Sequence, residues 1–251
     1  MSRYFIEVSY NGTSYAGFQI QKNANTVQAE VEKALHIYYR VVFNLTGSSR
    51  TDAGVHAQQN FFHFDTNLMD DNSLLPKAVY HLNAILPDDI VIKSIFPVNE
   101  TAHCRFDAVS RSYQYTIFKN KDPFLQGRGY YYPYALNLKK LQIAAGLLLT
   151  YNDFESFAKK NNQAHTNQCN VMASEWIQKK DALIYNVTAN RFLRGMVRGL
   201  VGTMLKVGRE ICSIETFKNI IENKISSKVD FSAPPQGLML IKVNFNEPSL
   251  K

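Results

Sequence analysis

The chain has 251 residues, of which 45% are hydrophobic and 20% charged, a length that suits one large domain or two small ones. Its three cysteines form no CxxC pair, which argues against a disulfide framework and against a zinc finger. The N-terminus lacks a signal-peptide pattern, and the longest apolar stretch, residues 192–207, contains three basic side chains, so we expect a cytoplasmic protein without a membrane span.

The hydrophobic periodicity of the first half predicts strands and helices in irregular succession. Thr26 is placed to cap the first helix, and Pro76 falls in the first turn of the second, where proline is tolerated. We expect the last strand of this half to stop at Pro97. The predicted strands cover residues 3–10, 41–45, 59–64 and 90–96, and the predicted helices cover residues 26–40 and 73–86.

The second half shows the same mixture, including a hairpin formed by residues 172–177 and 182–189. Because strands and helices do not alternate strictly, the predicted fold class is α+β. The other predicted strands cover residues 112–118 and 238–245, and the predicted helices cover residues 138–149, 191–207 and 214–225.

Charge is distributed unevenly along the chain. Residues 1–105 contain 8 basic and 10 acidic residues, a net charge of −2, whereas residues 106–251 contain 20 basic and 11 acidic residues, a net charge of +9. A basic second half indicates a polyanionic partner, most simply nucleic acid. We therefore expect an N-terminal half, 1–105, and a basic C-terminal half, 106–251.

The loop from Gly47 to His56 is the most unusual segment of the chain. It places one carboxylate, Asp52, between Arg50 and Gly54. Glycine permits a tight turn that a ligand can approach closely, and loops on a rigid scaffold often carry catalytic residues. The alternative is an aspartate that only satisfies backbone groups in a turn, which the loop's composition alone favours.

Four further stretches accompany this loop between residue 3 and about residue 245. They are residues 10–19, 103–115, 192–202 and 237–240. Together with Gly47 and the run from Arg50 to His56, they resemble the tRNA pseudouridine synthases of the TruA type. The five pieces occur in the family's order, so the resemblance is specific.

The resemblance implies a fold and a function. The fold would be a pseudouridine synthase fold, with two related α/β halves whose sheets join around a central catalytic cleft. The function would be the isomerisation of uridine to pseudouridine at positions 38, 39 and 40 of the tRNA anticodon stem–loop. The resemblance also implies that the enzyme needs no cofactor and that it is a homodimer in which each tRNA touches both subunits.

The same resemblance assigns roles to individual residues. Asp52 matches the family's nucleophile, and Tyr113 matches a tyrosine that stacks on the flipped-out target base. Arg198 matches an arginine that pairs with the aspartate, and Arg50 matches one that helps extrude the nucleotide. Neither the residues nor the resemblance decides whether Asp52 attacks C6 of the base or C1′ of the ribose, or whether the Tyr113 hydroxyl moves a proton.

The late helix predicted at 191–207 fits such a role. Arg191, Arg194 and Arg198 are spaced i, i+3, i+7 and would form one stripe, beside a glycine stripe that lets another backbone approach. We expect Arg191 and Arg194 to contact the RNA backbone. A guanidinium such as that of Arg198 opposes the rise in pKa that burial causes in a carboxyl group.

Other functions fit the residues less well. An aspartic protease needs two carboxylates that share a proton, and the chain has no second Asp-x-Gly turn. A zinc-dependent base deaminase needs H-x-E and P-C-x-x-C motifs, which the chain lacks, and no metal is expected. A non-catalytic RNA-binding protein explains the charge but leaves Asp52 without a purpose, and it is the main alternative.

Overall fold

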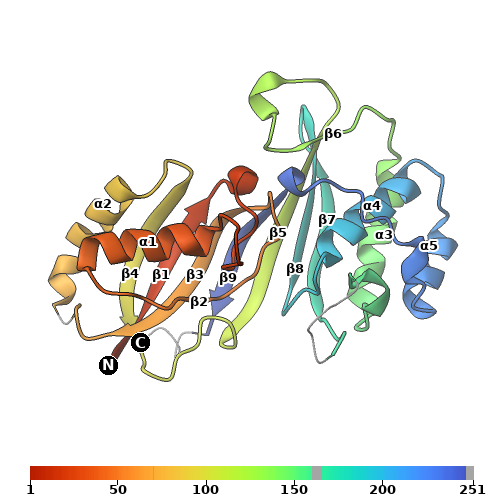
Figure 1. The fold of residues 1–251 in the computed structure, drawn as a ribbon. Helices are drawn as coiled ribbons and strands as arrows, with labels where there is room; N and C mark the ends of the chain where they lie inside the picture. Colours follow the sequence, from red (N-terminus) through yellow and green to blue (C-terminus); the bar gives the residue numbers. More distant parts are fainter. Residues whose placement is uncertain (70, 160–165, 247–251) are drawn as a thin grey trace. The chain divides into compact units, whose positions relative to one another are not determined.

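The computed structural model describes residues 1–69, 71–159 and 166–246, which form two compact units (Figure 1). Unit 1 consists of Met1–Val109 and the segment that begins at Met239, and unit 2 consists of Ser110–Leu238. The compact units thus differ from the halves defined by charge, because the last strand packs with the N-terminal residues. The functional halves 1–105 and 106–251 stay a prediction.

Unit 1 is a mixed sheet with two helices (Figure 1). Its elements in chain order are β1 (Ser2–Tyr10), α1 (Val27–Tyr39), β2 (Thr46–Gly47), β3 (His56–Thr66), α2 (Leu75–Ile85), β4 (Ile90–Val98) and β9 (Leu238–Phe245). Strand β1 pairs antiparallel with β3 and β4, while β3 pairs antiparallel with β2 and parallel with β9. The predicted cap is confirmed, since the Thr26 side chain accepts a hydrogen bond from the backbone N–H of Ala29 at 3.3 Å.

The strand predicted at residues 41–45 is wrong. Helix α1 ends at Tyr39 and is capped by Arg40, which has a left-handed backbone (φ 62°), and the chain then runs irregularly as far as β2. Two side chains of α1 replace a strand partner: Glu32 accepts a hydrogen bond from Leu45 N at 3.0 Å, and Gln28 donates one to Leu45 O at 2.8 Å. Because these bonds satisfy the backbone N–H and C=O groups of Leu45, the residue can be buried without pairing to a neighbouring strand.

The prediction that the fourth strand stops at Pro97 is also wrong. Strand β4 continues to Val98, and Pro97 lies opposite Tyr4 of β1. β4 is the outermost strand of the unit 1 sheet in the described residues. Proline is tolerated there because an edge strand does not need every N–H for pairing.

Unit 2 combines an antiparallel sheet with three helices (Figure 1). Its elements in chain order are β5 (Ala108–Phe118), β6 (Tyr130–Tyr131), α3 (Leu138–Leu147), β7 (Val171–Gln178), β8 (Ala182–Ala189), α4 (Met196–Gly208) and α5 (Ile214–Glu222). β8 pairs antiparallel with β5 and β7, and β6 adds a short parallel pairing to β5. The hairpin and the α+β class are confirmed. None of the helices in the described ranges is long and apolar enough to cross a membrane.

The helix predicted from Arg191 onward begins only at Met196. Gly195, directly before it, has φ 73°, a left-handed conformation that glycine adopts without strain. This kink separates the helix from the residues before it. Arg191 and Arg194 therefore precede the helix, and the predicted stripe shared with Arg198 is wrong.

Glycines of α4 allow a neighbouring segment to approach the helix closely. A Cβ atom at Gly202 would lie 2.2 Å from the carbonyl oxygen of Asp230, and one at Gly199 would lie 2.8 Å from the ring of Phe231. Thr203 secures this approach, because its hydroxyl accepts a hydrogen bond from Asp230 N at 3.0 Å. The predicted close approach of another backbone is confirmed.

We predict that Gly202→Ala lowers the free energy of unfolding by about 1–3 kcal/mol, because the added methyl group collides with backbone. Gly146→Ala is the matched control: the site has no neighbouring atom within 4 Å and lies in helix α3, so this change should raise stability by about 0.5–1 kcal/mol. Urea unfolding of both variants measures the difference. A Gly202→Ala protein as stable as the wild type would contradict the close packing.

Candidate active site

The loop that contains Asp52 is held by backbone hydrogen bonds on both sides of the carboxylate. Before it, the carbonyl of Thr51 accepts a bond from Phe18 N at 3.1 Å. After it, Gly54 N donates to the carbonyl of Tyr15 at 3.3 Å. Asp52 closes its own turn by accepting from the N–H of residue 55 at 3.2 Å. The position of the Asp52 backbone is therefore defined by the residue 15–18 loop.

Two glycines make this contact between loops possible. A Cβ atom at Gly12 would lie 2.0 Å from the carbonyl oxygen of Val55. One at Gly17 would lie 2.9 Å from the carbonyl oxygen of Thr51, and Gly17 also has φ 120°. A side chain at either position would push the two loops apart, so both glycines position Asp52.

Buried polar side chains of unit 1 add to this support, and the sequence motifs assign no role to Asn60 or Tyr10. The Nδ1 atom of His56 accepts a hydrogen bond from Gly12 N at 3.0 Å. Asn60 donates to the carbonyl of Ser49 at 2.8 Å, and the Tyr10 hydroxyl lies 2.8 Å from the Thr51 hydroxyl. β3 contains several other polar residues, so no pattern within the strand singles out His56 and Asn60.

The residues of this loop differ in their exposure. Thr51 and Val55 are buried, Asp52 is half-buried, and Arg50 is exposed. A short carboxylate on a fixed backbone can act as a nucleophile, because little reorganisation is needed to bring it to a substrate. The catalytic role of Asp52 stays a prediction.

Arg50 lines a cavity of about 160 Å³ in unit 1. It is also lined by β2, by Phe18 and by the turn that contains His103, Arg105 and Phe106. The resemblance includes these last residues but assigns them no role. Only the fold shows that they share a cavity with Arg50.

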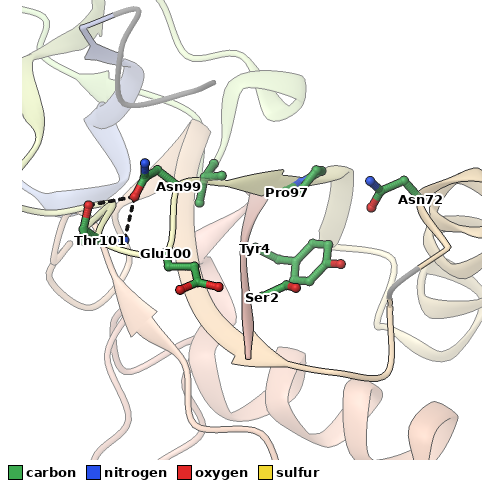
Figure 2. Close-up of a pocket in the computed structure, with 8 residues that line it drawn as sticks. Ser2, Tyr4, Asn72, Pro97, Asn99, Glu100 and Thr101 are labelled. Atoms are coloured by element: carbon green, nitrogen blue, oxygen red, sulfur yellow. Dashed lines mark hydrogen bonds between the residues drawn. The ribbon is translucent and has the colours of Figure 1, made fainter.

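A larger cavity of about 550 Å³ lies elsewhere in unit 1 (Figure 2). It is lined by residues of β1 such as Tyr4, by the end of β4 and the segment after it, including Glu100, and by Asn72. Asn99 accepts two hydrogen bonds from Thr101 there, at 2.9 and 2.8 Å. No residue of the Asp52 loop lines this cavity, so it is not part of the candidate site.

The other predicted site residues lie in unit 2. Arg198, in the first turn of α4, donates a hydrogen bond from Nε to the carbonyl of Ala233 at 2.7 Å. This bond fixes the direction of the long side chain. Arg191 is half-buried and Arg194 is exposed in the segment before α4.

Two tyrosines of β5 are both buried, and only 9% of Tyr113 is exposed. Tyr115 is fully buried, its hydroxyl donates to the carbonyl of Pro234 at 2.8 Å, and burial raises its pKa. The Tyr113 ring meets the Phe192 ring edge-on, with centroids 5.2 Å apart. Tyr115 is therefore a core residue, and Tyr113 remains the candidate for base stacking.

Comparison with known proteins identifies the family. A family model described as tRNA pseudouridine synthase matches residues 6–107 and 144–246. The chain belongs to the tRNA pseudouridine synthase family. Proteins named tRNA pseudouridine synthase A are similar to it throughout: one from Parabacteroides distasonis is 42% identical, over 98% of this chain and 97% of its own. Those from Porphyromonas gingivalis (40%; 97% of each chain) and Staphylococcus aureus (36%; 99% of this chain, 92% of its own) are also related.

Family membership confirms the predicted family and makes the chain an isomerase. It also accounts for the α+β architecture. The roles of the individual side chains do not follow from the match, and they stay predictions. Within the described ranges, no group of three or more His, Cys, Asp or Glu side chains is placed to hold a metal ion.

A buried histidine supports the wall of the Arg50 cavity. His63, on β3, accepts a hydrogen bond at Nδ1 from Cys104 N at 3.3 Å, and this atom lies 3.2 Å from the Cys104 sulfur. Burial lowers the pKa of His63 to about 4, and the neighbouring His103 ring contributes to this shift. His63 is therefore neutral in the folded protein at neutral pH.

We predict that acid weakens unit 1 through His63. A histidine with a folded pKa of about 4 and an unfolded pKa of about 6.5 stabilises the fold fully above pH 6.5. This contribution is lost as the pH falls from about 6.5 to 4. The melting temperature of the wild type should fall more steeply over this range than that of His63→Gln, which retains His103. Parallel melting curves at each pH would contradict the prediction.

Proposed function

We propose that this enzyme isomerises uridine to pseudouridine at positions 38, 39 and 40 of the tRNA anticodon stem–loop, with Asp52 as the nucleophile. The geometry of the Asp52 loop carries the proposal. Its backbone is fixed on both sides, and Arg50, two residues before Asp52, is exposed and lines a cavity. Family membership supports the same reaction.

The chemistry needs an ionised carboxylate and a base that is free to rotate. The bond between C1′ and N1 breaks, the uracil turns, and a bond forms between C1′ and C5. The C5 proton leaves and N1 gains one, so the product has the composition of the substrate, and the reaction's balance needs no redox cofactor. Asp52 can serve by adding to C6 or to C1′, since both steps need a charged nucleophile.

The other side chains would bring the uridine to Asp52 and hold it there. Extrusion of a base from a stem costs a few kcal/mol, and the exposed side chain of Arg50 is placed to occupy the vacated position. We propose that the Tyr113 ring stacks on the extruded base. We assign Arg198 the task of keeping the carboxylate ionised, because its guanidinium stays charged and its direction is fixed through Nε.

Binding of the rest of the tRNA belongs to the same proposal. Arg191 and Arg194 would contact phosphates, in keeping with the net charge of +9 in residues 106–251. We further propose a cytoplasmic homodimer that works without a cofactor. The arrangement of two related halves around a central cleft is also part of the proposal.

We predict that Asp52→Asn abolishes turnover while tRNA binding persists, because an amide has the size of a carboxylate but is not a nucleophile. Tritium release from C5-labelled uridine in tRNA should fall by about 10⁴-fold or more. Asp88→Asn is the control, since it makes the same chemical change at an exposed position and should not alter turnover.

Two results would contradict this assignment. Tritium release by pure Asp52→Asn protein, free of wild-type enzyme, would exclude Asp52 as the nucleophile. A wild-type protein that binds tRNA but releases no tritium would favour a non-catalytic RNA-binding protein.

We predict that Tyr113→Phe reduces single-turnover rates about 10²- to 10⁴-fold, the usual contribution of a general acid or base. Stacking alone does not require a hydroxyl, and the chain uses phenylalanine at 16 other positions. Tyr113→Ala, measured at saturating tRNA, also removes the stacking platform. A Phe variant with the wild-type rate would limit Tyr113 to stacking. Wild-type rates for both variants would exclude Tyr113 from the site.

A further inference from the structure

Four aromatic rings of unit 1 form a column from the core to the surface. The ring centroids of Phe5 and His63 are 6.1 Å apart, those of His63 and His103 are 4.5 Å apart, and those of His103 and Phe106 are 4.2 Å apart. Phe5 is fully buried, whereas Phe106 is 74% exposed. The outermost ring of the column thus presents aromatic surface outside the protein.

A tight turn holds Phe106 in this position. Asp107 accepts a hydrogen bond from His103 N at 2.7 Å and donates one from its own N–H to the His103 carbonyl at 3.0 Å. The Nδ1 atom of His103 also accepts from Phe106 N at 3.3 Å. Cys104, inside the turn, is fully buried, and its sulfur donates to the carbonyl of Thr46 at 3.1 Å. A ring held in this way loses little conformational freedom when a ligand stacks on it.

The cavity beside Phe106 is cationic. Arg50 and Arg105 both line it, together with the Gln19 amide, and no acidic residue does. The guanidinium carbon of Arg105 lies 5.6 Å from the centroid of the Phe106 ring. An aromatic ring on which a base can stack, beside guanidinium groups that bind phosphate, is the combination that binds single-stranded nucleic acid.

We propose that Phe106, Arg105 and the cavity they share with Arg50 form a subsite for an unpaired nucleotide next to the reacting uridine, a role that rests on the proposed function. Its base stacks on Phe106, and its phosphate lies at the guanidinium groups. Arg50 is two residues before Asp52, so their Cα atoms are at most about 7 Å apart. This distance places the subsite beside the nucleotide that reacts at Asp52.

The subsite gives the enzyme a preference among uridines. A nucleotide in the middle of a helix must lose its pairing and stacking before its base can reach Phe106. A nucleotide at the end of a stem or in a loop is already unpaired, and such bases are the ones that aromatic side chains capture in RNA. The subsite therefore favours uridines at the junction of a stem and a loop.

The test measures binding to two hairpin RNAs by Asp52→Asn protein, which leaves the RNA chemically unchanged. One hairpin carries an unpaired base next to the target uridine, and the other carries an abasic nucleotide at the same position. The pair is made twice, once with this position on the 5′ side of the uridine and once on the 3′ side. Phe106→Ala should weaken binding of the hairpin with the base about 5- to 150-fold. When the abasic nucleotide is on the side that occupies the subsite, Phe106→Ala should leave binding of the abasic hairpin nearly unchanged.

Two further variants separate stacking from a structural role. Phe106→Trp should recover most of the lost affinity, because it restores an aromatic face. Tyr80→Ala removes an equally exposed ring (73%) on α2 that lines neither cavity, and it should bind both hairpins like the parent protein.

Two outcomes would overturn the subsite: no loss of affinity in Phe106→Ala, or an equal loss with base-bearing and abasic hairpins on both sides. The tritium assay on wild-type enzyme tests the proposed function separately. With an active wild type, either outcome would remove only the subsite.

Discussion

The hydrogen bonds between the loop at residues 15–18 and the Asp52 loop are the constraint on which the candidate site of unit 1 depends. They join backbone to backbone, so the position of Asp52 does not depend on the conformation of any flexible side chain. The contact is possible only because Gly12 and Gly17 have no Cβ atom. A carboxylate on such a backbone can be presented to a substrate with little reorganisation of the loop.

In both units, the candidate site side chains are adjacent to buried residues that fix the local backbone. In unit 1, exposed Arg50 lies beside buried Thr51, and exposed Phe106 follows a turn that is fixed by buried Cys104. In unit 2, the segment packed on the glycines of α4 supplies the Ala233 carbonyl that orients Arg198. Burial of small or apolar neighbours stabilises the fold, while Arg50 and Phe106 stay exposed and Arg198 is half-buried.

Much of this architecture could be predicted from the sequence because local periodicity records which face of an element is buried. The helix after Thr26 and the hairpin at 171–189 follow from such patterns, as does the α+β class. The glycines of α4 indicated a close approach, which Asp230 makes. The segment around Asp52 was sufficient, with four others, to indicate the family.

The tertiary structure alone decided what depends on residues distant in the sequence. Leu45 was predicted in a strand, but side chains of α1 satisfy its backbone instead. The start of α4 depends on the left-handed backbone of Gly195, which periodicity does not record. Phe106 had no assigned role in the sequence, and only the fold shows that it lines a cavity with Arg50. The sequence by itself determined the fold class, the family and the candidate nucleophile, because these depend on local patterns and motifs. The surroundings of that nucleophile depend on hydrogen bonds and packing between segments that only folding brings together.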